Sequence, residues 1–268
     1  MNGTKKFHAR MGIGFPLPFL CVLLLFSCMV ALGQIRDVSS ETTLGQILVN
    51  SFGGCNWMEE IDLQYIISWM MLYIPAGISA SIVLANRTSG FMRMEGYRYG
   101  KLLRWYASLV GQVMLTVGVV MLTQVLFVVV AALCSGHTGI GIWVNDADQF
   151  LVQNTVRSAL TPVLFVLYGE VITLLASVVF LVFRNMTWYF VALMLPSLLG
   201  AACCSRLTRS SLFNPLHWGM SLRLSVEGCS GVAPALAAGG LVAVCAILIV
   251  IGGVYCCLTA PFDCASET

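Results

Sequence analysis

Residues 87–105 read RTSGFMRMEGYRYGKLLRW and lie between two long apolar runs, at residues 64–85 and 102–133. This basic segment carries five Arg and Lys residues against one acid, Glu95. Long apolar runs that are joined by a basic loop are typical of a membrane protein whose loop lies in the cytoplasm. The stretch therefore predicts a polytopic membrane fold and gives its first orientation.

The composition agrees with a membrane fold. Of the 268 residues, 59% are hydrophobic and only 10% are charged. A soluble domain carries about a quarter charged residues, so lipid is expected to be the main solvent of this chain. The basic residues stay close to the apolar runs and form no extended patch, which disfavours nucleic acid as a partner. No polar stretch is long enough for a separate soluble domain, so residues 1–268 are expected to form one transmembrane domain.

The apolar runs predict an all-α integral membrane protein with about six transmembrane helices. The expected spans are residues 15–33, 64–85, 102–133, 158–183, 188–204 and 232–258. Run 15–33 also resembles a secretory signal peptide, but it is longer than the usual apolar core, so a retained span is favoured. Short helices are expected at 43–52 and 213–218, and Pro75 is expected to kink the second span.

The distribution of basic residues sets the expected orientation. With both termini in the cytoplasm, nine Arg and Lys residues lie inside and five outside, as the positive-inside rule requires. Residues 34–62 and 205–231 then lie outside, and Arg184-Asn185 forms a tight turn between spans four and five. Arg206, Arg209 and Arg223 fit this orientation least well. If the fifth run does not span, the C-terminal half is inverted.

Apolar side chains are interleaved with the charges of the basic segment. A short cytoplasmic helix between spans two and three would present them to a soluble partner. The residues expected to make this contact are Phe91, Arg93, Met94, Glu95, Tyr97 and Arg98. The alternative is an ordinary solvated loop of the kind that every polytopic membrane protein needs.

Glu170 is the one acidic residue inside a predicted span. A carboxylate in lipid is costly, and such residues usually face the bundle interior or a wet cavity. Glu170 is therefore predicted to be an intramembrane polar site, either on a translocation path or in a hydrogen-bonded packing role. Tyr168 is expected to point elsewhere. The small-residue pairs Gly77/Ser81 and Gly111/Gly118 are candidates for close helix contacts.

Several kinds of chemistry have no motif in the sequence. There is no His-Glu-x-x-His, no Gly-x-Ser-x-Gly and no pair of aspartates within spans, so no catalytic residue is assigned. Residues 96–102 superficially resemble a phosphate loop, but Leu102 replaces its Ser/Thr. The chain has no Cys-x-x-Cys pair and its three histidines are scattered, which makes a metal site improbable. Cys55, Cys134 and Cys229 are candidates for disulfide pairing outside.

With these features together, the chain resembles an ABC-transporter permease subunit of the type-2 exporter class. The segment Arg98-Tyr99-Gly100-Lys101 followed by Arg104-Trp105 is similar to an Arg-x-Gly-Ser/Lys-Arg…Trp pattern in small six-span permeases of bacterial peptide export and self-immunity systems. The resemblance implies a dimer of permease chains, homo- or heteromeric, on separate ATP-binding subunits. ATP and Mg would be bound by the partner, and the cytoplasmic segment would be a coupling helix.

The resulting expectation is a multi-pass cell-membrane permease that exports a peptide or an amphipathic, lipid-like molecule and catalyses no reaction itself. Two other classes stay open at this point. One is a membrane-embedded immunity or binding protein that sequesters its ligand without transport. The other is an intramembrane enzyme without a recognisable motif.

Overall fold

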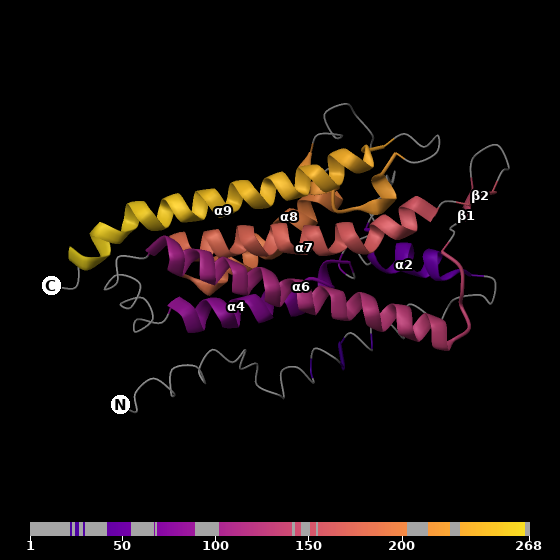
Figure 1. Cartoon of the computed structure of the whole chain (residues 1–268), viewed down its shortest axis with the longest axis horizontal. Coiled ribbons are helices and arrows are strands. Elements are labelled where there is room, and N and C mark those ends of the chain that lie inside the picture. The colour runs from indigo at the N-terminus through magenta and orange to yellow at the C-terminus, as the bar shows by residue number, and fades with distance from the viewer. Residues whose placement is uncertain are drawn as a thin grey trace, which may run out of the picture.

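The computed structural model describes part of the chain as a bundle of long helices (Figure 1). The described residues are 22, 25–26, 29, 42–54, 67, 69–88, 102–140, 143–145, 151–153, 155–202, 214–225 and 231–265. Four helices in this part of the chain are long and apolar enough to cross a membrane. They are Trp69–Thr88, Leu102–Cys134, Thr155–Phe183 and Pro234–Leu258. The chain is therefore a membrane-embedded helical protein, as its sequence predicts.

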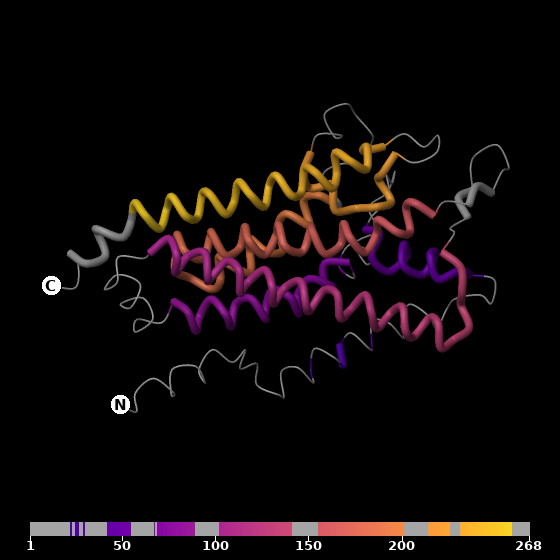
Figure 2. The backbone as a smooth tube through the Cα atoms, viewed as in Figure 1, coloured from indigo at the N-terminus to yellow at the C-terminus, as the bar shows by residue number. Residues whose placement is uncertain are grey.

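The elements follow one another in a simple order. They are α2 (Leu44–Phe52), α4 (Ile74–Thr88), α6 (Leu102–Cys134), β1 (Trp143–Asn145), β2 (Leu151–Gln153), α7 (Thr155–Phe183), α8 (Met186–Ala202), η3 (Pro215–His217), η4 (Ser221–Arg223) and α9 (Pro234–Ala265). The long helices alternate in direction along the bundle (Figure 2). The end of α4, the start of α6 and the end of α9 consequently lie at one end of the bundle.

Helix α7 is the central helix, and α6 and α9 are the most exposed. Of the apolar window of α7, 67% is buried, against 28% for both α6 and α9. Helix α7 packs against α2, α4, α6, α8 and α9. The exposed faces of α6 and α9 carry large apolar side chains, including Leu122, Leu126, Ile247 and Val250. Such faces are suited to lipid tails, because lipid does not penalise apolar surface.

The tight turn predicted at Arg184-Asn185 is confirmed. Arg184 adopts the left-handed conformation with φ 51°, and its amide donates to the Phe180 carbonyl at 2.7 Å. The Asn185 side chain then accepts a hydrogen bond from the Thr187 amide at 2.8 Å. This bond satisfies one of the free amides at the start of α8. Helices α7 and α8 are therefore antiparallel neighbours, and their contact is extensive.

Helix α8 corresponds to the predicted fifth span, residues 188–204, but it is short. It has 17 residues, and its apolar part is Met186–Gly200. At 1.5 Å per residue it is about 25 Å long, slightly less than the hydrocarbon layer. It nevertheless returns the chain to the end of the bundle at which α7 begins, because Gly200 and Arg157 both contact the segment around η4.

The second predicted span, residues 64–85, is confirmed in its described part, with a break near its start. The amides of Leu72 and Tyr73 donate to carbonyls only three residues back, and not four. Pro75 explains this local tightening, because its ring has no amide hydrogen and displaces the carbonyl four residues earlier. The disturbance expected from Pro75 is seen as a tightened turn at Leu72 and Tyr73, directly before α4.

Two predicted elements lie mostly outside the described residues. Of the first expected span, residues 15–33, only Val22, Leu25, Phe26 and Met29 are described, and all four are helical. Residues 89–101 of the basic segment are not described at all. The described chain resumes at Leu102, where α6 begins and runs without interruption for 33 residues, about 50 Å.

A cap closes the end of the bundle at which α7 begins. The cap consists of α2, η3, η4 and a bridge between Leu224 and Val232. Both short helices predicted from sequence belong to it: 43–52 is α2, and 213–218 contains η3. The Thr43 hydroxyl accepts from the Gln46 amide at 3.1 Å and so caps the start of α2. The Leu222 amide donates to the Gly53 carbonyl at 3.1 Å and joins η4 to the end of α2.

The strands β1 and β2 and the short helix η4 were not predicted. Strands β1 and β2 form a small antiparallel hairpin, with Val144 opposite Val152. Residues 135–155 were expected to form a loop because they contain several glycines and aspartates. The short runs Trp143-Val144 and Leu151-Val152, on either side of the aspartates, are the β-forming signal that this reading missed.

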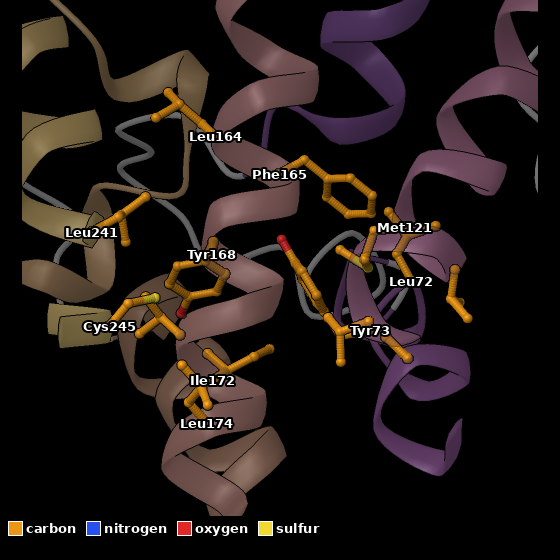
Figure 3. Close-up of a cluster of buried hydrophobic side chains, with 14 of the residues drawn as sticks. Leu72, Tyr73, Met121, Leu164, Phe165, Tyr168, Ile172, Leu174, Leu241 and Cys245 are labelled. Atoms are coloured by element: carbon orange, nitrogen blue, oxygen red, sulfur yellow. The ribbon is translucent and has the colours of Figure 1, made fainter. Parts of the chain in front are cut away.

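The core of the bundle is aromatic near the cap (Figure 3). Tyr73 lies 5.2 Å from Phe165 and 5.6 Å from Tyr168, measured between ring centroids. Phe52 of α2 stacks obliquely on Phe165 at 4.5 Å, and Trp69 on Tyr168 at 5.6 Å. Each such pair contributes about 0.5–1.5 kcal/mol beyond burial. The cap and the bundle therefore share one core.

Candidate functional site in the bundle

Glu170 lies in the middle of α7 and is buried, with 7% of its surface exposed. The side chain faces Gly118 of α6. Its Oε2 atom has no hydrogen-bond partner among the described residues. Tyr168 points to a different face of α7, toward the aromatic core, as predicted. The carboxyl group thus lies at the contact between α6 and α7.

Gly118 creates the space that Glu170 occupies. A Cβ atom at Gly118 would lie 3.2 Å from Glu170 Oε1, a tighter contact than most side chains make. The predicted role of Gly118 in a close helix contact is therefore confirmed. Gly111, its predicted partner, has nothing within 4 Å of such a Cβ position and makes no close contact in the described structure.

Two more buried polar side chains belong to the same pair of helices. Gln124 of α6 is 2% exposed, and neither its oxygen nor its nitrogen has a hydrogen-bond partner among the described residues. The Thr173 hydroxyl of α7, one turn from Glu170, is also buried without such a partner. Buried polar groups in proteins are nearly always hydrogen-bonded. These unpaired groups of α6 and α7 could therefore bind a water molecule, a proton or a polar group of a ligand.

The second candidate site, the basic segment, lies outside the described residues. Phe91, Arg93, Met94, Glu95, Tyr97 and Arg98 all belong to this undescribed part. The structure does describe both of its ends. Arg87 Nε, in the last turn of α4, donates to Gln112 Oε1 of α6 at 2.7 Å. The segment is therefore anchored on two helices that are hydrogen-bonded to each other.

The cap contains a polar cluster that the sequence analysis did not identify. Arg223 is 1% exposed and His217 is fully buried. Arg223 Nη1 donates to the Gly200 carbonyl at 2.8 Å and is hydrogen-bonded to His217 Nδ1. The Gly200 carbonyl lies near the C-terminal end of α8, where the helix dipole stabilises a positive charge. Arg223 thereby joins η4, η3 and α8.

Burial and the neighbouring guanidinium both change the pKa of His217. Desolvation is the larger cause and the charge of Arg223 the second, and together they lower the pKa of His217 to about 4. The ring is therefore neutral at pH 7. Its Nδ1 is bonded to Arg223, and its Nε2 lies 3.2 Å from the side-chain nitrogen of Asn214. The signal for this pair in the sequence was weak, since one His and one Arg six residues apart match no motif.

Arg157 makes a second buried contact within the cap. Its Nη2 donates to the Leu224 carbonyl at 3.1 Å, and Arg157 is 6% exposed. One turn later, the Thr161 hydroxyl lies 2.6 Å from the Ser221 hydroxyl of η4. Arg157 and Arg223 are two of the five basic residues expected outside. Since both are buried in the cap and bound to carbonyls, they serve structure there and are poor indicators of membrane orientation.

The cysteines and acids show no metal site in the described residues. No group of three His, Cys, Asp or Glu side chains is close enough there to hold a metal ion. Cys134, one of the three cysteines considered for pairing, carries a free, exposed thiol. Cys55 and Cys229 lie outside the described residues.

Comparison of the chain with protein-family models, with curated proteins and with solved structures finds no match in any of the three.

Proposed function

We propose that this chain is the membrane-spanning permease subunit of an ATP-driven exporter. Its substrate is a peptide or an amphipathic, lipid-like molecule, and a separate ATPase chain supplies the energy. The permease acts as a dimer in the cell membrane, with ATP and Mg bound by the partner ATPase. The chain itself catalyses no reaction.

The observation that carries the proposal is how the basic segment is attached to the helix bundle. It connects α4 to α6 at the end of the bundle away from the cap, and the bond between Arg87 and Gln112 ties these two helices together. A partner that moves the segment would therefore move α4 and α6 as a pair. Helix α6 in turn contacts α7, α9 and α2, so the displacement would reach both Glu170 and the cap.

Glu170 supports transport over simple anchoring. It lies between α6 and α7, with one carboxyl oxygen that has no partner in the described structure. A group of this kind within a membrane span is costly and is usually retained for function. A rearrangement of α6 or α9 against α7 would change its surroundings, which is what alternating access requires.

The proposed topology has six spans. Residues 15–33 form the first, α8 forms the fifth, and the four long apolar helices form the rest. Both termini and the basic segment lie in the cytoplasm, and the cap lies outside. A slight local thinning of the bilayer is enough to accommodate the length of α8.

The experiment is co-purification of the ATPase with the full chain from its native membranes. A short helix from residue 89 to residue 97 would place Phe91 and Met94 on one face, and apolar anchors of this kind carry most of the affinity in an interface. Phe91→Asp with Met94→Asp is expected to abolish co-purification of a Walker-type ATPase while leaving membrane insertion intact. Arg98→Ala is expected to weaken coupling only mildly.

The matched control is Ser89→Asp with Gly96→Asp, which adds the same two charges to the opposite face of that helix. This variant is expected to keep the partner. If the Phe91/Met94 variant also keeps it in full, the segment is an ordinary positive loop and the coupling role is wrong. If both variants lose it, added negative charge and not the apolar anchors explains the loss.

A further inference from the structure

The helices around Glu170 carry almost no charge. Of the helices that pack against α7, α2 and α8 contain no charged residue, and α9 contains none between residues 234 and 258. Helices α4 and α6 carry one arginine each, Arg87 and Arg104, and both lie at the ends that adjoin the basic segment. A carboxylate at Glu170 therefore has no oppositely charged neighbour in the middle of these helices.

The described arginines are either distant from Glu170 or bonded to other groups. Arg87 donates to Gln112, and Arg223 donates to the Gly200 carbonyl. The other three are separated from Glu170, or from Gly118 opposite it, by about 20 Å of helix: Arg104, Arg157 and Arg184. Glu170 Oε2 accordingly has no hydrogen-bond partner among the described residues.

Thr173 provides a second unpaired oxygen beside Glu170. It lies three residues later on α7, and the Cβ atoms of residues with this spacing are about 5–6 Å apart. Its hydroxyl is buried and has no hydrogen-bond partner among the described residues. The hydroxyl of Ser177, one turn further, is instead bonded within the helix, to the Thr173 carbonyl at 2.7 Å. One turn of α7 thus presents two buried oxygens that lack a donor.

These two oxygens determine which group would satisfy them. An ionised carboxylate only accepts hydrogen bonds, and a threonine hydroxyl accepts as well as donates. An ammonium group has three donors and no acceptor, and its charge is opposite to that of the carboxylate. Hydrogen bonds between ionised groups are about twice as strong as neutral ones. An anionic group would be repelled by the carboxylate and would leave Oε2 without a donor.

We propose that Glu170 and Thr173 form a binding site for an ammonium group of the transported molecule, so that the exported substrate is cationic. The ammonium group donates to Glu170 Oε2 and to the Thr173 hydroxyl. An amphipathic amine and a lysine side chain of a peptide both carry this group, and the test below distinguishes the two. The site rests on the transport role proposed above and specifies the charge of its substrate.

The contact between α6 and α7 has to open before such a group can enter, because the carboxyl group lies within it. Gly118, which the carboxyl group faces, has no side chain to fill the opened space. The bond between Arg87 and Gln112 joins α4 to α6 on the side of the basic segment. A partner that moves this segment would therefore move the wall of the site that α6 provides.

The test measures equilibrium binding to the full-length chain in nanodiscs, without ATP, after binding to empty nanodiscs is subtracted. One pair of probes is dodecylamine and N-dodecylacetamide, which share a tail and differ in charge. The other pair is an apolar peptide with blocked ends and one lysine, and the same peptide with that lysine acetylated. At about pH 7 both amines are protonated.

The amine of at least one pair should bind to the parent chain more tightly than its acetylated form. Glu170→Gln keeps the size of the side chain and removes its charge. This variant should weaken amine binding by about 10- to 100-fold, the equivalent of one hydrogen bond to a charged group. Binding of the acetylated probe should not change. The pair that shows this loss identifies the source of the ammonium group.

Thr173→Val removes the hydroxyl with little change in shape and should weaken amine binding by about 2- to 10-fold. Ser177→Ala is the matched control, because its hydroxyl is already bonded within α7 and is not available to a ligand. It should leave amine binding unchanged. If Glu170→Gln does not fold, the comparison of Thr173→Val with Ser177→Ala decides whether this turn of α7 binds the amine.

Equal binding of the charged and acetylated forms in both pairs would overturn the site. The same conclusion would follow if Glu170→Gln kept the preference for the amine, or if Thr173→Val and Ser177→Ala weakened amine binding equally. Failure of the transport role gives a different result. A chain that prefers the amine but carries no ATPase contradicts the exporter alone, whereas a chain that carries the ATPase but shows no such preference contradicts the site alone.

Discussion

The hydroxyl of Tyr189, near the start of α8, donates a hydrogen bond at 2.8 Å to the carbonyl of Gly77 in α4. Gly77 also lies against Leu193, one turn further along α8, so a Cβ at Gly77 would overlap that side chain. These two contacts hold α8 against α4, although the two helices are separated in sequence by α6 and α7. The orientation of the short α8 therefore depends on the absence of a side chain at residue 77.

Replacing Gly77 should dislodge α8. In Gly77→Leu the new side chain overlaps Leu193, and overpacking of this kind costs about 1–3 kcal/mol. The melting temperature of the detergent-solubilised chain should fall. Gly111→Leu is the control, because it adds the same side chain to a long apolar helix at a place with no neighbour within 4 Å. Equal decreases in melting temperature in the two variants would show that Gly77 makes no specific contact with α8.

A similar contact joins α6 to α9. The Tyr106 hydroxyl donates to the Ile249 carbonyl at 3.0 Å, and a Cβ at Gly252 would overlap that hydroxyl. Gly252→Leu should therefore break the hydrogen bond and lower the melting temperature by more than Gly239→Leu does, because Gly239 has no neighbour within 4 Å. A smaller loss in Gly252→Leu than in Gly239→Leu would contradict this packing of α9.

Glu170 should matter for coupling more than for folding. Glu170→Gln keeps the size of the side chain and removes its capacity to ionise. Normal expression and unchanged melting are expected, with altered transport or altered stimulation of the partner ATPase. Gly118→Ala, which presses a methyl group against Glu170 Oε1, should alter the same activity, and Gly111→Ala should not. Unchanged activity in both Glu170→Gln and Gly118→Ala would assign Glu170 a packing role.

The stability of the chain should show the titration of His217. Its pKa in the folded chain, about 4, is below the ordinary 6.5. The stabilising contribution of neutral His217 is therefore complete above pH 6.5 and is lost as the pH falls toward 4. The melting temperatures of the parent chain and of His217→Asn should diverge as the pH falls across this window, because the parent chain should lose more stability than the variant. Parallel curves would show that protonation of other groups accounts for acid sensitivity.

The proposed orientation predicts which thiols are reached from outside intact cells. Cys134 is free and exposed near the cap, and Thr187 is exposed at the opposite end, just after the α7–α8 turn. A chain with Cys134 alone should react with an impermeant maleimide in intact cells. A chain with only Thr187→Cys should react only after permeabilisation. The reverse pattern would place the cap in the cytoplasm.

Much of the helical bundle was predictable because apolar length is a strong signal. Helices α6 and α7 begin and end within a few residues of their expected spans, whereas α9 begins two residues late and continues to Ala265, seven residues past the expected end. The described part of the second span is helical from Trp69 to Thr88. Arg184-Asn185 was predictable because two polar residues between apolar runs leave room only for a tight turn. The burial of Glu170 followed from the cost of a carboxylate in lipid.

The structure of the cap was harder to predict from the sequence. Two of its three helical pieces, α2 and η3, were predicted and η4 was not. The assembly of the cap depends on contacts between residues far apart, such as Arg157 with Leu224 and Thr161 with Ser221. Arg223 was expected outside the membrane and fitted the predicted orientation poorly; its guanidinium is in fact buried and bound to Gly200 and His217. Periodicity and composition do not reveal which carbonyl will satisfy a buried arginine.

The most direct test of the central claim is ATP hydrolysis by the chain after purification, alone and with the ATPase that co-purifies with it. The account predicts no hydrolysis by the chain alone and hydrolysis by the complex that responds to Glu170→Gln. The complex should not form with Phe91→Asp and Met94→Asp, and should form with Ser89→Asp and Gly96→Asp. If the full chain, purified intact from its native membranes, carries no ATP-hydrolysing partner, then it is not the permease subunit of an ATP-driven exporter.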